Sequence, residues 1–429
     1  MSAEADRGMK LRMRWGGKVF LSLADQAMFS GATFVLNILE ARWLSPSDYG
    51  AFAVAFSVFL FVSGFHNALI LEPMSVLGPA RYSELPSEYL DGVLWTHAAV
   101  SSGALLLMAA AGLVFRAAGL PVSGPLLGLA IGSPAILSFW LFRRICYLKT
   151  RPELALAGSL LHALILVLGL LAAHRLGRSS PFSAFLILGL SGLAASLLLR
   201  RSIGVESKRI SWTAIKPAVH SFLSRHWSYA RWVLGSAFVF WLSGAVYPPL
   251  IAGLLGLEAT GVFQAMQNLI RPLQNVLVAC GLLFLPWVSR QRAGKGEGCA
   301  HRIMVGVMAV HIAAACLYLA ALMIGKRWIV PLLYGRGYYD GFLWLLGYLG
   351  AASLIGAMIQ GLHIWLKAFE RPEAVFWSQT AGAAATLTVG LLLVWRLKLC
   401  GAASGLVLSA AVMALVLLYF LFRSVPCRR

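Results

Sequence analysis

Long apolar segments follow one another along almost the whole chain, and they restrict its fold more than any other feature. A helix rises about 1.5 Å per residue, so about 20 apolar residues cross the ~30 Å hydrocarbon core of a bilayer. Twelve such segments are predicted, at residues 17–39, 49–71, 92–115, 121–143, 154–174, 181–200, 229–254, 260–286, 302–325, 341–366, 374–395 and 400–422. Hydrophobic residues make up 59% of the chain and charged residues 12%, which excludes a soluble or a disordered chain. The sequence therefore predicts an all-α integral membrane protein with twelve transmembrane helices.

The basic residues fall mainly between the apolar segments, and their distribution predicts the orientation of the chain. If the N-terminus is cytoplasmic, 26 of the 36 Lys and Arg residues lie on the cytoplasmic side and 9 on the opposite side, while Arg271 lies within a segment. Because basic loops are retained in the cytoplasm, this asymmetry predicts that both termini are cytoplasmic. The formal net charge of +20 then reflects topology, so nucleic acid is not expected as a partner.

Motifs for metal, cofactor or nucleotide binding are not found in the sequence. The six cysteines are scattered without a CxxC pair, at positions 146, 280, 299, 316, 400 and 427. The chain has neither the phosphate-binding GxxxxGK[ST] motif nor the zinc-binding HExxH motif, and no polar segment is long enough to fold into a catalytic domain. A cofactor, a metal site and an enzymatic activity are therefore not expected.

Two short motifs occur once in each half of the chain. Residues 44–52 (LSPSDYGAF) open the second segment, and residues 255–263 (LGLEATGVF) open the eighth, 211 positions later. Arg151-Pro-Glu153 follows the fourth segment, and Arg371-Pro-Glu373 follows the tenth, 220 positions later. Because both pairs occur in the same order and on the same predicted membrane side, they indicate a 6+6 duplication in parallel orientation.

The longest polar stretch separates the two predicted halves and contains seven basic residues between positions 200 and 231. We expect part of it to form an amphipathic helix on the anionic inner leaflet. The predicted division is a cytoplasmic N-terminal segment (1–16), an N-lobe with helices 1–6 (17–200), a basic cytoplasmic linker (201–228), a C-lobe with helices 7–12 (229–422) and a cytoplasmic tail (423–429). Within the seventh segment, Tyr247-Pro-Pro249 predicts a kink.

Polar side chains within two apolar segments are the candidates for a functional site. In the eighth segment they form a stripe of Gln264, Gln267, Asn268, Arg271, Gln274 and Asn275. In the first segment, Asp25, Asn37 and Glu40 lie near one helical face. An arginine near the bilayer centre costs at least about 2.5 kcal/mol on insertion scales, so Arg271 needs a partner or water. We expect the stripe to face a hydrated cavity; the alternative is that its amides bond across a packed helix interface.

A fixed positive charge in such a cavity favours an anionic substrate, because a guanidinium group forks well onto phosphate oxygens. The segment of the first half that corresponds to the eighth is far less polar, so the second half is expected to supply more of the site. Arg143 and Arg144 end the fourth segment near the inner surface. They either collect an anionic head group from the cytoplasmic leaflet or simply anchor the helix end.

The sequence after the first segment resembles a known signature. Glu40-Ala-Arg42-Trp-Leu-Ser-Pro-Ser-Asp48-Tyr-Gly50-Ala-Phe52 is similar to the motif that follows the first helix of polysaccharide flippases. These flippases belong to the multidrug/oligosaccharidyl-lipid/polysaccharide (MOP) flippase superfamily. The run from Gly261 to Ala265 that leads to Arg271-Pro272 is also typical of them. The resemblance covers almost the whole chain, and it implies two six-helix bundles that form a V-shaped central cavity.

The resemblance also implies a function and its residues. It implies alternating-access transport of a polyprenyl-diphosphate-linked oligosaccharide from the inner to the outer leaflet of a bacterial-type cytoplasmic membrane, for polysaccharide biosynthesis of the O-antigen or exopolysaccharide type. The implied partners are the lipid bilayer, the lipid-linked oligosaccharide and polysaccharide-assembly proteins such as a glycan polymerase. Arg271 fits the basic residue that meets the diphosphate, whereas the second segment has no matching arginine. The expected cavity residues are Arg271, Gln264, Gln267, Asn268, Gln274, Asn275, Asp25 and Asn37, with Arg143 and Arg144 as the residues that first meet the head group.

Two other functions stay open at this stage. One is a multidrug or cation antiporter of the same superfamily, in which Asp25 would be the proton- or sodium-binding carboxylate. The other is a membrane glycan polymerase or glycosyltransferase. Such enzymes usually carry a long catalytic loop on the outer face, whereas the longest outer loop here runs only from Gly325 to Tyr339. That comparison favours transport over catalysis.

Overall fold

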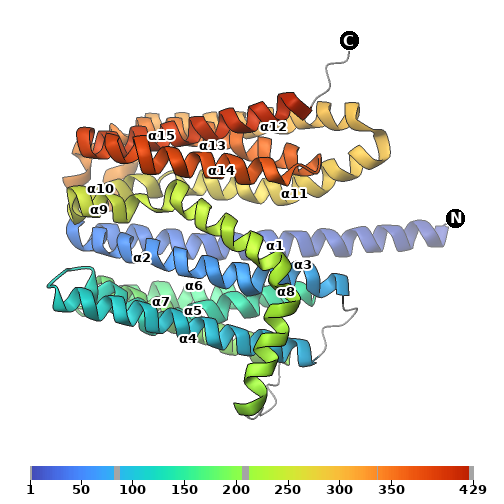
Figure 1. Cartoon of the computed structure of the whole chain (residues 1–429), viewed down its shortest axis with the longest axis horizontal. Helices are drawn as coiled ribbons and strands as arrows, with labels where there is room; N and C mark the ends of the chain where they lie inside the picture. The colour runs from blue at the N-terminus through green and yellow to red at the C-terminus, as the bar shows by residue number, and fades with distance from the viewer. Residues whose placement is uncertain (1, 82–86, 205–211, 336, 425–429) are drawn as a thin grey trace. The chain divides into compact units, whose positions relative to one another are not determined.

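The computed structural model describes residues 2–81, 87–204, 212–335 and 337–424 (Figure 1). Within these ranges the secondary structure is helical, and no β-strand occurs. The chain divides into two compact units. Unit 1 comprises Met1–Leu36 and Val58–Ala237, and unit 2 comprises Asn37–Ser57 and Phe238–Arg429. Unit 2 therefore includes a short piece of the first half of the chain, and unit 1 includes the start of the seventh predicted segment. The lobe boundaries predicted from the sequence stay a prediction.

The helices of unit 1 account for the first six predicted segments and the start of the seventh, and those that begin at Ser2, Pro46 and Trp212 each have a part in unit 2. They are α1 (Ser2–Trp43, which continues into unit 2), α2 (Pro46–His66), the π-helix η1 (Asn67–Leu71), α3 (Glu72–Arg81), α4 (Ser87–Ala117), α5 (Ser123–Leu148), α6 (Pro152–Arg175), α7 (Pro181–Ile203) and α8 (Trp212–Phe240). Of the predicted linker, residues 201–203 form the end of α7, and the residues from Trp212 onward belong to α8, which is continuous with the seventh segment. Large apolar side chains from η1 to α8, such as Phe139 and Phe222, form the core of this unit.

Helices α5 and α7 approach each other so closely that their backbones touch. A Cβ atom added to Gly189 would lie 2.6 Å from the Cα atom of Gly132. Small residues allow this approach, which strengthens helix packing in a membrane.

We expect Gly189→Ala to lower the stability of unit 1 by about 1–3 kcal/mol, because the added methyl group forces two packed helices apart. Gly103 on α4 is a matched control, since a Cβ there meets nothing within 4 Å. Thermal unfolding in detergent should therefore show a lower midpoint for Gly189→Ala and an unchanged or higher midpoint for Gly103→Ala. Equal midpoints for the two variants would contradict the role of the contact.

The helices of unit 2 account for the remaining segments. They are η2 (Trp241–Ala245), α9 (Tyr247–Leu255), α10 (Leu257–Asn268), α11 (Arg271–Lys295), α12 (Glu297–Tyr334), the 3₁₀-helix η3 (Tyr338–Phe342), α13 (Leu345–Ala368), α14 (Pro372–Ala385), η4 (Thr386–Gly390) and α15 (Leu391–Ser424). The stretches Val219–Ala245 and Tyr247–Leu255 are bent by 45° against each other. The kink predicted at Tyr247-Pro-Pro249 is therefore confirmed.

Two irregular stretches account for most of the difference between the nine candidate spans of the described residues and the twelve predicted segments. Among the described residues, nine helices are long and apolar enough to cross a membrane, or ten if the bent pair is one span. One of the nine, Glu373–Arg423, has 51 residues, which would be about 76 Å if straight. Lys398 interrupts it with a φ of 54°, and a Cβ on Gly401 would lie 1.8 Å from the carbonyl oxygen of Leu393, so the chain folds back there. This stretch therefore accommodates the two predicted segments 374–395 and 400–422.

The local backbone repeats at the second duplicated motif. Helix α6 begins at Pro152 and α14 at Pro372, and each follows a residue of positive φ, Thr150 at 52° and Glu370 at 61°. Arg151 forms an ion pair of 3.3 Å with Glu153, and the equivalent pair of the second half measures 3.9 Å. The same turn is thus built twice by equivalent residues, as expected for a duplication.

Candidate substrate site

The eighth predicted segment is not one continuous helix. Helix α10 ends at Asn268, and the amide groups of Leu269 and Ile270 bond to carbonyl groups three residues back, at 3.3 and 3.0 Å. Helix α11 begins at Arg271 and has Pro272 in its first turn, where the missing N–H group is tolerated. The predicted stripe is therefore divided. Gln264 and Asn268 are buried on α10, Gln267 is half-buried, and Gln274 and Asn275 are exposed on α11.

A chain of hydrogen bonds connects the buried amides with the piece of the first half that lies in unit 2. Gln264 donates to Asn268 at 3.1 Å, and Asn268 donates to the hydroxyl oxygen of Tyr49 at 2.5 Å. The Tyr49 hydroxyl in turn donates to Asn37 at 3.4 Å. The structure thus brings together three of the predicted cavity residues, Asn37, Gln264 and Asn268, through a tyrosine that the sequence analysis did not select.

Arg271 lies beside this chain without a partner for its charge. Its electrostatic neighbours are Tyr49 and Tyr334, and the Tyr334 hydroxyl donates to the carbonyl oxygen of Ala265 at 2.7 Å. Within the part of the chain that the structure describes, no side chain forms a hydrogen bond or an ion pair with its guanidinium group. A half-buried guanidinium without a counter-ion attracts an anion strongly, because few water molecules compensate its charge.

Two more polar groups near Tyr49 are buried without a hydrogen-bond partner among the described residues. They are the Oε2 atom of Glu40, on α1, and the hydroxyl of Tyr339, on η3, and both residues interact electrostatically with Tyr49. We call the eight residues the Arg271 cluster: Asn37, Glu40, Tyr49, Gln264, Asn268, Arg271, Tyr334 and Tyr339. Its unused hydrogen-bonding capacity is what a polar ligand would satisfy.

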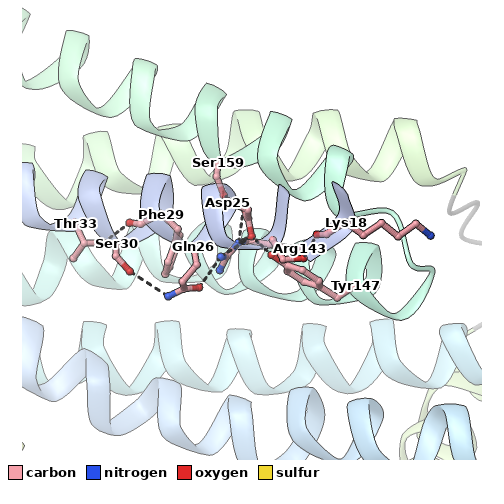
Figure 2. Close-up of polar contacts among 10 residues, drawn as sticks. Lys18, Asp25, Gln26, Phe29, Ser30, Thr33, Arg143, Tyr147 and Ser159 are labelled. Atoms are coloured by element: carbon pink, nitrogen blue, oxygen red, sulfur yellow. Dashed lines mark hydrogen bonds and ion pairs between the residues drawn. The ribbon is translucent and has the colours of Figure 1, made fainter. Parts of the chain in front are cut away.

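Asp25 is not part of this cluster, since it belongs to unit 1, where it is fully buried. Figure 2 shows its carboxylate between α5 and α6. The Arg143 guanidinium binds it with nitrogen–oxygen distances of 2.7 to 3.0 Å, and Ser159 donates to it at 2.5 Å. The hydroxyl of Tyr147 is a third donor. Every acceptor site of the Asp25 carboxylate thus faces a donor of the protein itself.

Arg143 is held in place by further contacts of the same network. It donates to the side-chain oxygen of Gln26 at 2.9 Å, and its guanidinium lies 4.3 Å from the centre of the Phe29 ring (Figure 2). Arg144, the next residue, is exposed. Arg143 is therefore held by contacts within the protein, whereas Arg144 is exposed. The predicted role of both residues in meeting the head group stays a prediction.

The fold is similar to that of solved transporters of the MOP superfamily. Nearly the whole chain aligns with an inward-facing multidrug resistance MATE family transporter, with 94% of this chain and 98% of that chain covered, a TM-score of 0.73 and 13% identity. The lipid II flippase MurJ aligns over 94% of this chain and 87% of its own, with a TM-score of 0.67 and 15% identity. A MOP superfamily transporter from Pyrococcus furiosus aligns over 95% of both chains, with a TM-score of 0.64 and 12% identity.

No model of a known protein family and no curated protein matches the sequence. At these identities the structural similarity shows the fold alone. Together with the long apolar helices, it shows a multi-pass membrane protein whose fold is similar to that of these solved structures.

Sequence reasoning missed the tyrosines of the Arg271 cluster and the hydroxyl partners of Asp25. Tyr49 lies next to Gly50, within both the duplicated motif and the second apolar segment. This double position could have identified Tyr49 as a candidate site residue from the sequence. Tyr334 and Tyr339 lie on either side of Gly335 and Gly337 in the sequence and carry no signal of their own. Tyrosines often lie at the membrane interface, so a tyrosine near a segment end does not by itself indicate a site.

Proposed function

We propose that this chain is a flippase that moves a polyprenyl-diphosphate-linked oligosaccharide from the inner to the outer leaflet of the cytoplasmic membrane by alternating access. The product would enter polysaccharide biosynthesis of the O-antigen or exopolysaccharide type, with glycan-assembly proteins such as a polymerase as partners. The observation that carries the proposal is the unpaired Arg271 guanidinium among buried amide and phenol groups. The resemblance of the motif at residues 40–52 to polysaccharide flippases supports it independently.

The chemistry of the Arg271 cluster suits the two polar parts of such a substrate. The guanidinium group of Arg271 can donate two parallel hydrogen bonds to oxygens of the diphosphate. The negative charge of the diphosphate would then serve as the counter-ion of Arg271. The amides of Asn37, Gln264 and Asn268 both donate and accept, as the hydroxyl groups of sugars require. Gln267, Gln274 and Asn275 extend the amide surface along the two helices. The prenyl chain would stay in the lipid.

The runner-up is a multidrug or cation antiporter, because similar solved structures include MATE family transporters. In this function Asp25 would bind a proton or a sodium ion. Three donors of the protein already occupy its carboxylate, including Arg143. A cation would have to displace that arginine, so the arrangement favours an anionic substrate.

A transport assay with three substrates separates these functions. The purified chain is reconstituted into vesicles with a fluorescent polyprenyl-diphosphate-linked oligosaccharide, a neutral glycolipid with the same sugar, or a fluorescent cationic drug. We expect protein-dependent translocation of the diphosphate-linked lipid alone. Transport of the cationic drug in exchange for protons or sodium ions, without movement of the diphosphate-linked lipid, would replace the flippase with the antiporter.

A further inference from the structure

The two copies of the first duplicated motif pack against each other within unit 2. Helix α2 begins at Pro46 and α10 at Leu257, which are 211 positions apart like the motifs themselves. The glycine that follows each start, Gly50 on α2 and Gly261 on α10, is buried. A Cβ atom on Gly50 would lie 1.8 Å from the carbonyl oxygen of Leu257, and a Cβ on Gly261 would lie 2.0 Å from that of Pro46. Each glycine therefore contacts the first residue of the other helix.

This contact is reciprocal, as in a two-fold symmetric interface. Each added Cβ would also lie 3.1 Å from the backbone nitrogen of the opposite glycine. Equivalent atoms thus make equivalent contacts from both sides, which is the geometry of an isologous interface. Because real Cβ atoms do not approach other atoms to within 2 Å, no residue except glycine fits at position 50 or 261 while the helices are together. The two shared glycines of the sequence repeat have a physical cause in this contact.

Further bonds hold the same end of unit 2 together. Arg42, at the end of α1, donates to the carbonyl oxygens of Leu332 and Leu333 near the end of α12, at 2.9 and 3.5 Å. A cation at a helix C-terminus is stabilised by the exposed carbonyl groups there. The hydroxyl of Tyr338 donates to Glu258, in the first turn of α10. All these segments lie on the predicted outer side of the membrane.

The glycine contact is also connected to the Arg271 cluster. On α10, Gly261, Ala265 and Asn268 are four and three residues apart, so they lie on one face of the helix. Tyr49, adjacent to Gly50, receives the hydrogen bond of Asn268. Separation of α2 from α10 would break this bond and free the amide of Asn268, next to Arg271, for a ligand.

We propose that the two copies of the duplicated motif form the outer gate of the carrier, and that Gly50 and Gly261 are the point at which it closes. The gate is shut in this structure, because the two backbones are in contact. The inference rests on the proposed function only in that a carrier working by alternating access must open toward the outside. The identity of the substrate does not enter it.

Cysteine labelling in sealed right-side-out vesicles tests the gate without any substrate. The six native cysteines are replaced, and Ala265→Cys serves as the reporter, because Ala265 is fully buried one turn beyond Gly261. A membrane-impermeant maleimide is then added from outside. Overpacking at this contact destabilises the closed state relative to the open one, so the closed–open equilibrium shifts toward opening. We therefore expect labelling to become about tenfold faster when Gly50→Ala or Gly261→Ala is added to the reporter.

Two further variants make the outcome decisive. Gly253→Ala on α9 is the matched control, because a Cβ there meets nothing within 4 Å, and it should leave labelling unchanged. Arg42→Gln removes the bonds to α12 without adding volume at the glycines, and it should accelerate labelling less, but in the same direction. Size-exclusion elution and thermal unfolding show whether each variant is folded. If a glycine variant fails to fold, Arg42→Gln still tests the gate.

Unchanged labelling in folded glycine variants and in Arg42→Gln would overturn the gate. So would an equal acceleration in Gly253→Ala, or labelling that only a membrane-permeant maleimide produces. Any of these three results would leave the flippase proposal standing, because the assay contains no lipid-linked oligosaccharide. Conversely, a negative result of the three-substrate transport assay would leave the labelling result unaffected.

Discussion

Arg271→Ala is expected to reduce translocation of a polyprenyl-diphosphate-linked oligosaccharide by roughly 100-fold. Removal of one partner from a buried, charge-assisted contact costs about 2–5 kcal/mol, and each 1.4 kcal/mol is about tenfold. The fold should tolerate the change, because Arg271 forms no ion pair with a described residue that the substitution would break. The measurement is the initial rate of translocation in vesicles that contain equal amounts of folded protein.

Two further substitutions on α11 serve as controls for the Arg271→Ala measurement. Arg290, also on α11, is exposed, so Arg290→Ala should transport at the wild-type rate. Arg271→Lys keeps the positive charge but loses the forked geometry, and an intermediate rate is expected. Wild-type transport by Arg271→Ala would remove the guanidinium group from the mechanism and leave the flippase proposal without its main support.

The fold could be predicted well from the sequence, because a lipid environment leaves a chain few choices. Every backbone group in the bilayer must be bonded within its own segment, so a long apolar run is almost always a helix. Proline adds local detail, and the bend at Tyr247-Pro-Pro249 was predictable for that reason. The break after Asn268 was not predicted, although Pro272 gave a signal, since the residue before a proline avoids the helical conformation.

The candidate site was predictable only in part, because its contacts join distant residues. Asp25 and Arg143 are 118 positions apart, and their pairing depends on how α1 packs against α5. The periodicity of the first segment places Asp25 and Asn37 near one helical face, but the compact units divide α1 between Leu36 and Asn37. Periodicity identifies which residues share a face, whereas the packing of other helices decides what each part of that face meets.

The buried Asp25–Arg143 pair leads to the second large expected effect. We expect Arg143→Ala to destabilise unit 1 by about 3–5 kcal/mol, because it leaves the fully buried Asp25 carboxylate without its cation. For a unit of this size, such a loss lowers the midpoint of thermal unfolding in detergent by on the order of 10 °C. The exposed neighbour provides the control, since Arg144→Ala should change the midpoint by much less. Equal shifts for the two arginines would show that the pair does not stabilise the unit.

The double variant Asp25→Asn/Arg143→Gln separates a structural role of the pair from a role in ion coupling. Two neutral side chains of similar size leave no buried charge uncompensated, so the double variant should recover most of the stability that Arg143→Ala loses. If the pair is structural, translocation per folded molecule should recover as well, because the substrate meets Arg271 rather than Asp25. If stability returns and transport does not, the carboxylate of Asp25 takes part in energising transport. That combination would favour the antiporter, in which a carboxylate on α1 must release and rebind a cation during every cycle.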